Sequence, residues 1–218
     1  MKPDILDFLT DLKANNNREW FQEHKSRYEV ARKTFEAFID ELIPRIRAID
    51  PRIDLITAKD CVFRIYRDVR FSTDKSPYKP NMGAYIARGG KGSQMAGYYV
   101  HFEPGASFLA GGIYMPQPEI LKKIREEIYY QVDDFKKIIN NKEFLKVFGE
   151  IHDPDKMKNP PKGFAKDFPD IDLLKFRNYA VMHQVNDEKI LKEEYLDYAA
   201  DVFKTLYPFN VFFNRMFD

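Results

Sequence analysis

The stretch GYYVHFEPGASFLAGGIY, residues 97–114, contains two runs of aromatic and aliphatic side chains, 97–103 and 107–114. Proline and glycine separate the two runs, and such residues commonly bound β-strands. Two earlier runs of similar composition cover 61–66 and about 82–88. Because these short segments follow one another with brief connections, the sequence predicts a sheet that is mainly antiparallel.

Helical periodicity precedes the predicted sheet. Apolar residues between Ile5 and Leu12 recur every three or four positions, which predicts an amphipathic helix that ends at 15–17. A second apolar stripe runs from Trp20 to Leu42 and predicts one long helix from Arg18, with a kink at Pro44. We expect Asp50-Pro51 to end this helix, since the residue before a proline disfavours helical backbone.

Helical periodicity also follows the sheet. The apolar positions from Ile120 to Ile139 predict another long helix after Pro118. A last strand is predicted at 178–185, and a further helix then runs to about 206, where Pro208 should interrupt it.

The strands cluster in the middle of the chain instead of alternating with helices. This order favours an α+β fold, a central antiparallel sheet with long helices packed on it, over a doubly wound α/β fold. No repeat or long linker divides the sequence, so we expect a single domain over 1–218. Its expected parts are a helical N-terminal part (4–50), a sheet core (about 53–115 plus 178–185) and a helical C-terminal part (about 118–217).

Composition limits the classes of function. Hydrophobic residues make up 44% of the 218 positions and aromatic residues 15%, enough for a sizeable core. The formal net charge of +1 argues against a protein that binds polyanions over its whole surface, because such proteins are usually strongly basic. A local basic patch stays compatible with this charge, since the field of a cleft depends on its own side chains.

The expected compartment follows from the cysteine content and the hydropathy. Cys61 is the only cysteine, so no internal disulfide can form, which suits a reducing compartment. The N-terminus leads into an amphipathic helix instead of the apolar run of a signal peptide, and no stretch approaches the roughly 20 apolar residues that span a bilayer. We therefore expect a cytoplasmic protein with no membrane partner.

The segment 63–81, FRIYRDVRFSTDKSPYKPN, concentrates cationic side chains among aromatic ones. Guanidinium groups bind phosphate or carboxylate through two parallel hydrogen bonds, and lysines add point charge. We therefore expect an anionic or phosphorylated small molecule to bind here, with ligand contacts from Arg64, Arg67, Arg70, Lys75, Tyr78 and Lys79. A structural interpretation stays open, in which Arg67 pairs with Asp68 or Asp74 and the other charges form a solvated rim.

Candidate acid–base residues lie near this segment and on the strand 97–103. Alternation along that strand places Tyr99, His101 and Glu103 on one face. A histidine beside a carboxylate can act as a general acid–base pair, and Asp68 could contribute if the protein is an enzyme. An ordinary strand face with a structural hydrogen bond is the alternative.

Other kinds of site receive little support. The four histidines, His24, His101, His152 and His183, form no close pair, so no metal site is predicted and the sequence specifies no cofactor. The glycine-rich segment 89–93 lacks the ending of a phosphate-binding loop and is expected to be a mobile hairpin tip. Cys61 is expected to be a buried structural residue.

Several motifs together resemble one family. They are Asn16 to Phe21, Arg64 to Asn81, Gly97-Tyr98-Tyr99, His101 to Gly105, Gly112 to Pro116, Arg125-Glu126 and Pro161 to Phe164. On these motifs the chain resembles domain-of-unknown-function family 2461, a family of bacterial and fungal proteins, over most of its length. The resemblance implies a shared α+β fold and carries no established activity, cofactor or catalytic residue. Because it marks polar residues in a predicted loop, it favours a site near Arg64 to Lys79.

Two other functions remain open. Single-stranded nucleic acid could bind on the exposed sheet, with Tyr66, Tyr78 and Tyr99 as stacking platforms. A protein-interaction domain is the third hypothesis, because tyrosine, tryptophan and arginine dominate the contact centres of protein interfaces. The C-terminal aromatic segment 209–217 is expected to pack in the core, with a dimer contact as the alternative. The sequence does not specify the oligomeric state.

Overall fold

The computed structural model describes residues 3–68, 70, 73–165 and 167–217. At its centre lies a four-stranded antiparallel sheet in the order β1-β2-β3-β4. The strands are β1 (Met82–Ile86), β2 (Gly97–Phe102), β3 (Phe108–Ile113) and β4 (Tyr179–Gln184). The predicted α+β class and the four corresponding strands are confirmed.

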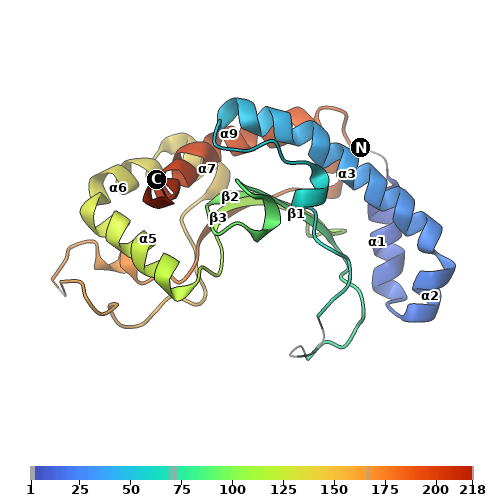
Figure 1. Cartoon of the computed structure of the whole chain (residues 1–218), viewed down its shortest axis with the longest axis horizontal. Coiled ribbons are helices and arrows are strands. Elements are labelled where there is room, and N and C mark those ends of the chain that lie inside the picture. The colour runs from blue at the N-terminus through green and yellow to red at the C-terminus, as the bar shows by residue number, and fades with distance from the viewer. Residues whose placement is uncertain (1–2, 69, 71–72, 166, 218) are drawn as a thin grey trace.

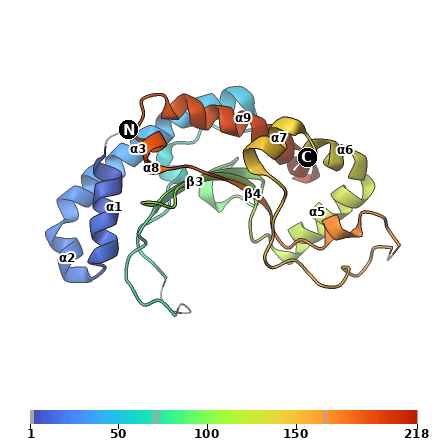
Figure 2. The ribbon, with the colours of Figure 1, turned by 180° about the vertical axis from the view of Figure 1, so that it is seen from behind.

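Helices lie before, between and after the strands (Figures 1 and 2). The N-terminal helices are α1 (Asp4–Ala14), α2 (Arg18–Glu23), α3 (Lys25–Ile49) and α4 (Ala58–Cys61). Those between β3 and β4 are α5 (Pro118–Tyr130), α6 (Val132–Ile139) and α7 (Lys142–Phe148), and α8 (Asp187–Ile190) and α9 (Tyr195–Asn214) follow β4. Short 3-10 turns are η1 (Gly90–Gly92), η2 (Ile171–Leu174) and η3 (Arg215–Phe217). None of the described helices combines the length and the apolar content needed to span a lipid bilayer.

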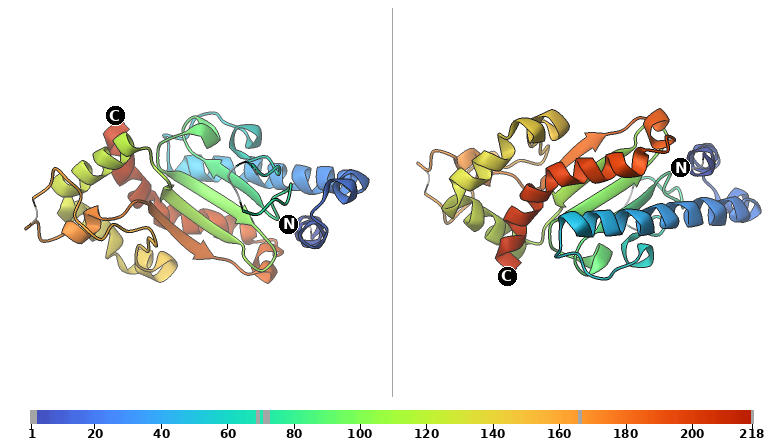
Figure 3. Two further views of the ribbon diagram at one scale, coloured as in Figure 1. Left: turned by 90° about the horizontal axis from the view of Figure 1, so that it is seen from below. Right: turned by 90° about the horizontal axis from the view of Figure 1, so that it is seen from above.

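One face of the sheet is covered by α3 and α9, which lie side by side across the strands (Figure 3). The alternate β2 residues Tyr98, Val100 and Phe102 are fully buried on this face. The Phe102 ring packs edge-on against Phe35 of α3, and the Tyr98 ring packs edge-on against Phe203 of α9, each pair with ring centroids 5.2 Å apart. Buried apolar side chains from the N-terminal helices, the sheet and the C-terminal helices form one contiguous core.

Two close contacts fix α9 on the sheet. At Gly111 of β3 there is no room for a side chain, because an added Cβ would lie 2.2 Å from Leu206 of α9. Near the end of α9, Asn214 exchanges two hydrogen bonds with the backbone of Ala96, at 2.8 Å and 3.0 Å, just before β2 begins. These contacts determine both how close the helix lies and where along the strand it sits.

In the described part of the chain, no helix lies over the opposite face of the sheet (Figure 3, left). It carries Tyr85 of β1, Tyr99 and His101 of β2, and Phe108 of β3, which the strand registers place side by side. The ring of Tyr99 lies flat over Gly83, where an added Cβ would meet the Tyr99 hydroxyl at 2.5 Å. We call this surface the open face.

The predicted strand at 61–66 is wrong. Cys61 ends α4, which begins with a capping box between Thr57 and Asp60, so the segment starts as a helical turn. Only isolated bridges follow, from Val62 to Ala84 and from Tyr66 to Tyr78. The backbone leaves the sheet here because the segment instead pairs with residues 77–79.

Several helix limits also differ from the predictions. The helix expected from Arg18 breaks at His24, whose ring stacks on Trp20 at 4.2 Å and contacts its carbonyl oxygen at 2.8 Å. The helix after Pro118 divides at Gln131 into α5 and α6. Pro208 does not interrupt the last helix, since α9 continues through it to Asn214. Burial of Phe209, Phe212 and Phe213 offsets the hydrogen bond that the proline removes. These phenylalanines lie in the core, as predicted.

Candidate functional site

A hairpin made of residues 62–68, 70 and 73–80 projects from the sheet beside α1 and α2 (Figure 1). We call it the cationic hairpin; Val69, Phe71 and Ser72 lie outside the described residues. Its two arms are joined by backbone hydrogen bonds from Arg67 to Pro77 (3.0 Å) and from Lys79 to Ile65 (2.8 Å). At its base, the N–H of Phe63 donates to the carbonyl of Gly83 in β1 at 2.9 Å, which attaches the hairpin to the sheet.

Tyr78 anchors the hairpin to the N-terminal helices. Its ring stacks on Phe21 of α2 with centroids 3.9 Å apart. The side-chain amide of Asn16 donates to the Tyr78 carbonyl (2.9 Å) and accepts from its N–H (3.1 Å). Only 3% of Tyr78 is exposed, so this residue holds the hairpin in place and presents little surface to a ligand.

Positive charges gather at the base of the hairpin around Lys79. Its ammonium donates to the Arg64 carbonyl at 3.2 Å and lies 5.8 Å from the centre of the Phe63 ring. Burial lowers the pKa of Lys79, and the charges of Arg64 and Arg67 lower it further. Among the described residues, no carboxylate forms an ion pair with Arg64 or Lys79. The structure therefore brings Arg64, Arg67 and Lys79 together.

Ion pairs within the hairpin join Arg67 to Asp74 and Arg70 to Asp68. Arg67 pairs with Asp74 through Nη1 at 2.9 Å, while its Nε–H is buried and finds no acceptor in the described part of the chain. The Arg70 side chain donates two hydrogen bonds to Asp68, at 3.0 Å and 2.7 Å, and its backbone N–H donates a third at 3.3 Å; together they hold the pKa of Asp68 at about 2. Lys75 is exposed.

A row of hydrogen-bonded side chains crosses the open face beside the hairpin. The Tyr99 hydroxyl lies 3.0 Å from Nδ1 of His101, and Nε2 of His101 lies 3.2 Å from Oε2 of Glu103. Lys13 of α1 pairs with the other oxygen of Glu103 at 3.5 Å. The Phe108 ring stacks on His101 with centroids 4.4 Å apart. Because a carboxylate only accepts, Nε2 carries the proton, and in the neutral ring Nδ1 accepts from Tyr99.

Burial determines the titration of this row. His101 is 9% exposed, and burial lowers its pKa although Glu103 acts in the opposite direction. Burial also raises the pKa of Tyr99 to about 12. Burial thus favours a protonated phenol and a neutral imidazole, so Tyr99 donates a hydrogen bond to Nδ1 of His101 while Glu103 orients the ring.

The ring of Phe63 connects the two groups of polar side chains. Its centre lies 6.3 Å from that of Tyr99, and the ammonium of Lys79 lies on it as well. By contrast, Asp68 and His101 share no contact within the described ranges, since Asp68 bonds to Arg70 and His101 to Tyr99 and Glu103.

Metal and thiol chemistry find no support in the described residues. No group of three or more histidine, cysteine, aspartate or glutamate side chains in that part of the chain could hold a metal ion. Cys61 is buried in α4, and burial raises the pKa of its thiol to about 12, which leaves it protonated at neutral pH.

Sequence reasoning missed two contributors to the site. Lys13 reaches Glu103 from a helix about 90 residues earlier in the chain, and Phe108 stacks on His101 from the neighbouring strand. Nothing in the sequence near Lys13 signals its role. For Phe108, the predicted hairpin with 97–103 would have indicated proximity only if the register had been known.

Comparison with known proteins gives a family and no relative of known activity. Neither the curated proteins nor the solved structures contain a match to the chain. The model of one family, described as a conserved hypothetical protein (DUF2461), matches residues 4–212. Since this match covers almost all of the chain and agrees with the motif resemblance, the chain belongs to the DUF2461 family.

Proposed function

We propose that the protein binds an anionic or phosphorylated small molecule at the base of the cationic hairpin, with Arg64, Arg67 and Lys79 as its cationic contacts. One observation carries the proposal. The ammonium of Lys79 is held beside the charges of Arg64 and Arg67, and neither Arg64 nor Lys79 pairs with a carboxylate in the described residues. Like charges held together repel, and an anion between them removes this repulsion.

The hydrogen-bonding capacity of the cluster supports the same conclusion. The Nε–H of Arg67 is buried without an acceptor. A buried donor left unpaired costs about 1–3 kcal/mol, so an oxygen of a bound anion would be favoured there. Guanidinium donors also match the geometry of phosphate and carboxylate.

The surroundings suggest a ligand with a planar part and a proton to exchange. Phe63 is 38% exposed next to Lys79 and offers a ring face for stacking. On its other side, the Tyr99–His101–Glu103 row supplies acid–base groups. We therefore extend the proposal to proton transfer on the bound anion by Tyr99 and His101.

Four residues expected at the site are left out of this proposal. Asp68 and Arg70 bond to each other, and a carboxylate held at a pKa of about 2 is a weak base and is not an acid at neutral pH. Tyr78 is buried against Phe21, and the side chain of Lys75 is exposed.

The test is a thermal-shift screen against phosphorylated metabolites, nucleotides and short oligonucleotides, at low and at physiological salt. A ligand at about 100 times its dissociation constant stabilises the fold by roughly 2.7 kcal/mol, which is readily measured. We expect a hit that disappears in the Arg64→Gln/Lys79→Gln double variant and persists in Lys123→Gln, an exposed lysine of α5. Unchanged affinity in the double variant would reject the site.

The same screen separates the alternatives. Single-stranded nucleic acid would show a steep loss of affinity with salt. Nucleic-acid binding is less well supported than a small ligand, because stacking needs exposed rings and Tyr78 is buried. Of the three predicted platforms, Tyr66 is the most accessible, at 49% exposed. A protein-interaction domain predicts no hit and a partner that binds the exposed side chains of the hairpin. The buried single cysteine supports a reducing compartment such as the cytoplasm for this function.

A further inference from the structure

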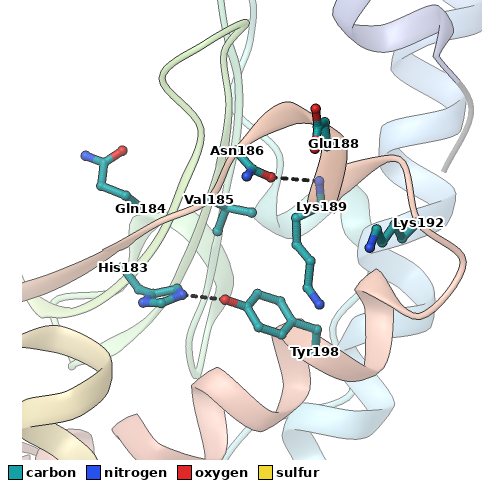
Figure 4. Close-up of a pocket in the computed structure, with 8 residues that line it drawn as sticks. All are labelled: His183, Gln184, Val185, Asn186, Glu188, Lys189, Lys192 and Tyr198. Atoms are coloured by element: carbon teal, nitrogen blue, oxygen red, sulfur yellow. Dashed lines mark hydrogen bonds between the residues drawn. The ribbon is translucent and has the colours of Figure 1, made fainter.

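A polar cavity lies on the side of the sheet that α9 covers. It is formed where β4 ends, α8 turns and α9 begins, and its volume is about 310 Å³ (Figure 4). That volume is at the lower end of the range for small-molecule sites. The side chains that line it include His183, Tyr198, Lys189 and Lys192, with Val185 as an apolar wall. None of them belongs to the proposed anion site at the cationic hairpin.

His183 and Tyr198 form a hydrogen-bonded pair at one side of this cavity. Nδ1 of His183 lies 2.8 Å from the carbonyl oxygen of Val147 in α7, and a carbonyl only accepts, so Nδ1 carries a proton. Nε2 lies 2.5 Å from the Tyr198 hydroxyl. In the neutral ring Nε2 accepts, and the hydroxyl proton of Tyr198 is directed to the histidine.

Two ammonium groups complete the cavity from α8 and the turn after it. Lys189 lies over the Tyr198 ring, 4.3 Å from its centre, and Lys192 reaches toward the cavity from the side opposite His183 (Figure 4). No carboxylate pairs with either lysine among the described residues. The only acidic lining residue is Glu188, which is exposed and points away from Tyr198 (Figure 4).

We infer that this cavity is a binding site for a small oxyanion, a phosphate, sulfate or carboxylate group, held by Lys189 and Lys192 and by the hydroxyl of Tyr198. The hydroxyl can donate to an anion only if His183 gives up its role as acceptor. Protonated His183 does so, because Nδ1–H keeps its bond to Val147 while Nε2–H donates to the Tyr198 oxygen. Binding of the anion is therefore coupled to protonation of His183.

The charges around His183 agree with this coupling. Lys189 and Lys192 line the same cavity, and their positive charges disfavour a protonated His183. Among the described lining residues, Glu188 is the one whose charge favours it. Val147 and Phe148 of α7, which contact the imidazole from the other side, carry no charge. An anion bound between the two lysines neutralises their charges, so its binding favours protonation of His183.

The test uses sulfate, whose charge does not change between pH 6 and pH 8. Sulfate is titrated into the full chain while the backbone amide signals of Asn186 and Lys189 are followed by NMR, together with those of Arg64 and Lys79. We expect saturable shifts at Asn186 and Lys189, and binding at that position several-fold tighter at pH 6 than at pH 8, because protonated His183 leaves the Tyr198 hydroxyl free to donate to the anion. His183→Gln should abolish the dependence on pH, and Tyr198→Phe should reduce it, because the charge of protonated His183 still favours the anion when the hydroxyl is absent.

Charge variants locate the anion. Lys189→Gln and Lys192→Gln should each weaken sulfate binding by about tenfold, the loss expected for one charge-assisted hydrogen bond. Lys204→Gln, an exposed lysine further along α9, removes the same charge and should have little effect. An equal loss in all three variants, or shifts at Arg64 and Lys79 with none at Asn186 and Lys189, would reject the cavity as a site. The same dependence on pH in wild type and Tyr198→Phe would reject the coupling.

This outcome is independent of the hairpin proposal. In the Arg64→Gln/Lys79→Gln variant, the cavity should bind sulfate with unchanged affinity, because none of its lining residues has been altered. A loss of sulfate binding at Asn186 and Lys189 in that variant would reject the second site as a separate one.

Discussion

At the scale of single residues, His101 is the group whose ionisation bears most directly on the proposed chemistry. Its neutral ring accepts the Tyr99 proton and donates to Glu103. Burial keeps its pKa below the ordinary histidine value, so the folded protein binds this proton less readily than the unfolded chain. Protonation of His101 at low pH would therefore remove the acceptor of the Tyr99 hydroxyl.

We predict that stability falls as the pH decreases below about 6.5, the ordinary histidine pKa. The direction follows from the lowered pKa of His101 in the folded protein. The stability that neutral His101 contributes is complete above the pKa of histidine in the unfolded chain, and it is lost as the pH falls from that pKa through the pKa in the folded protein. Urea unfolding at a series of pH values from 5 to 8 measures this. His101→Gln should flatten the curve, while His152→Gln, at an exposed position, should leave it as in the wild type.

At the scale of elements, the position of α9 on the sheet depends on buried amides. Asn214 exchanges hydrogen bonds with both backbone groups of Ala96, and Asn210 donates to the carbonyl of Gly97 at 3.0 Å. Both asparagines are buried, so water cannot replace these bonds. These directional hydrogen bonds fix the position of α9 along β2, which apolar packing alone would determine less precisely.

Asn214→Ala should lower the free energy of unfolding by about 2 kcal/mol, because it leaves the N–H and carbonyl of Ala96 buried without partners. Chemical denaturation measures the change. Asn159→Ala removes an exposed asparagine amide and is the matched control. A cost for Asn214→Ala no larger than that of the control would show that the helix does not depend on this contact.

Elements with a clear period could be predicted from sequence. The strand containing Tyr98 and the one containing Leu109 alternate between faces, and their limits agree with the prediction within one residue at each end. The run 61–66 has strand composition, yet the capped turn that ends at Cys61 and pairing with 77–79 decide its path. The predicted interruption at Pro208 is wrong, because burial of its aromatic neighbours, a tertiary effect, outweighs the local cost of proline.

The site could be predicted only in part. Tyr99, His101 and Glu103 share a face by alternation alone, and the structure joins them by hydrogen bonds. The burial of Tyr78 depends on Asn16, which lies 62 positions away, and no local pattern reveals such a contact. The grouping of Lys79 with Arg64 likewise requires the hairpin to fold back on itself.

At the scale of the whole molecule, the chain forms an arch with the sheet and its two long helices at the top (Figures 1 and 2). The N-terminal helices and the cationic hairpin descend at one end, and α5 with the connection 149–178 descends at the other (Figure 1). Asp153 ties this connection to the start of β4, because its carboxylate accepts from the N–H groups of Arg177 (2.6 Å) and Asn178 (3.0 Å). The carboxylate of Asp153 therefore holds the connection against the start of β4 at this end of the molecule.

Asp153→Ala should destabilise the protein by at least about 2 kcal/mol at neutral pH and expose the connection to limited proteolysis, since three backbone donors lose their acceptor. Burial alone would raise the pKa of Asp153, but its hydrogen bonds with Asn178, Arg177 and Asp155 outweigh burial and lower it. The stability that ionised Asp153 contributes is thus complete above pH 3.9, the ordinary aspartate pKa, and is lost as the pH falls from that value through the lowered pKa of the folded state. Asp155→Ala, at an exposed position, should resist proteolysis as the wild type does.

The contact between Asn214 and Ala96 spans 118 positions of the sequence. During synthesis, this separation means that Asn214 is made well after Ala96. At ordinary rates of synthesis, α9 emerges from the ribosome on the order of ten seconds after β2. During that interval the faces of Tyr98 and Leu109 that α9 will cover have no partner from that helix, although α3 already exists. A nascent chain that presents a half-covered apolar sheet for seconds is a substrate for chaperones, and the final helix ends that exposure when it docks.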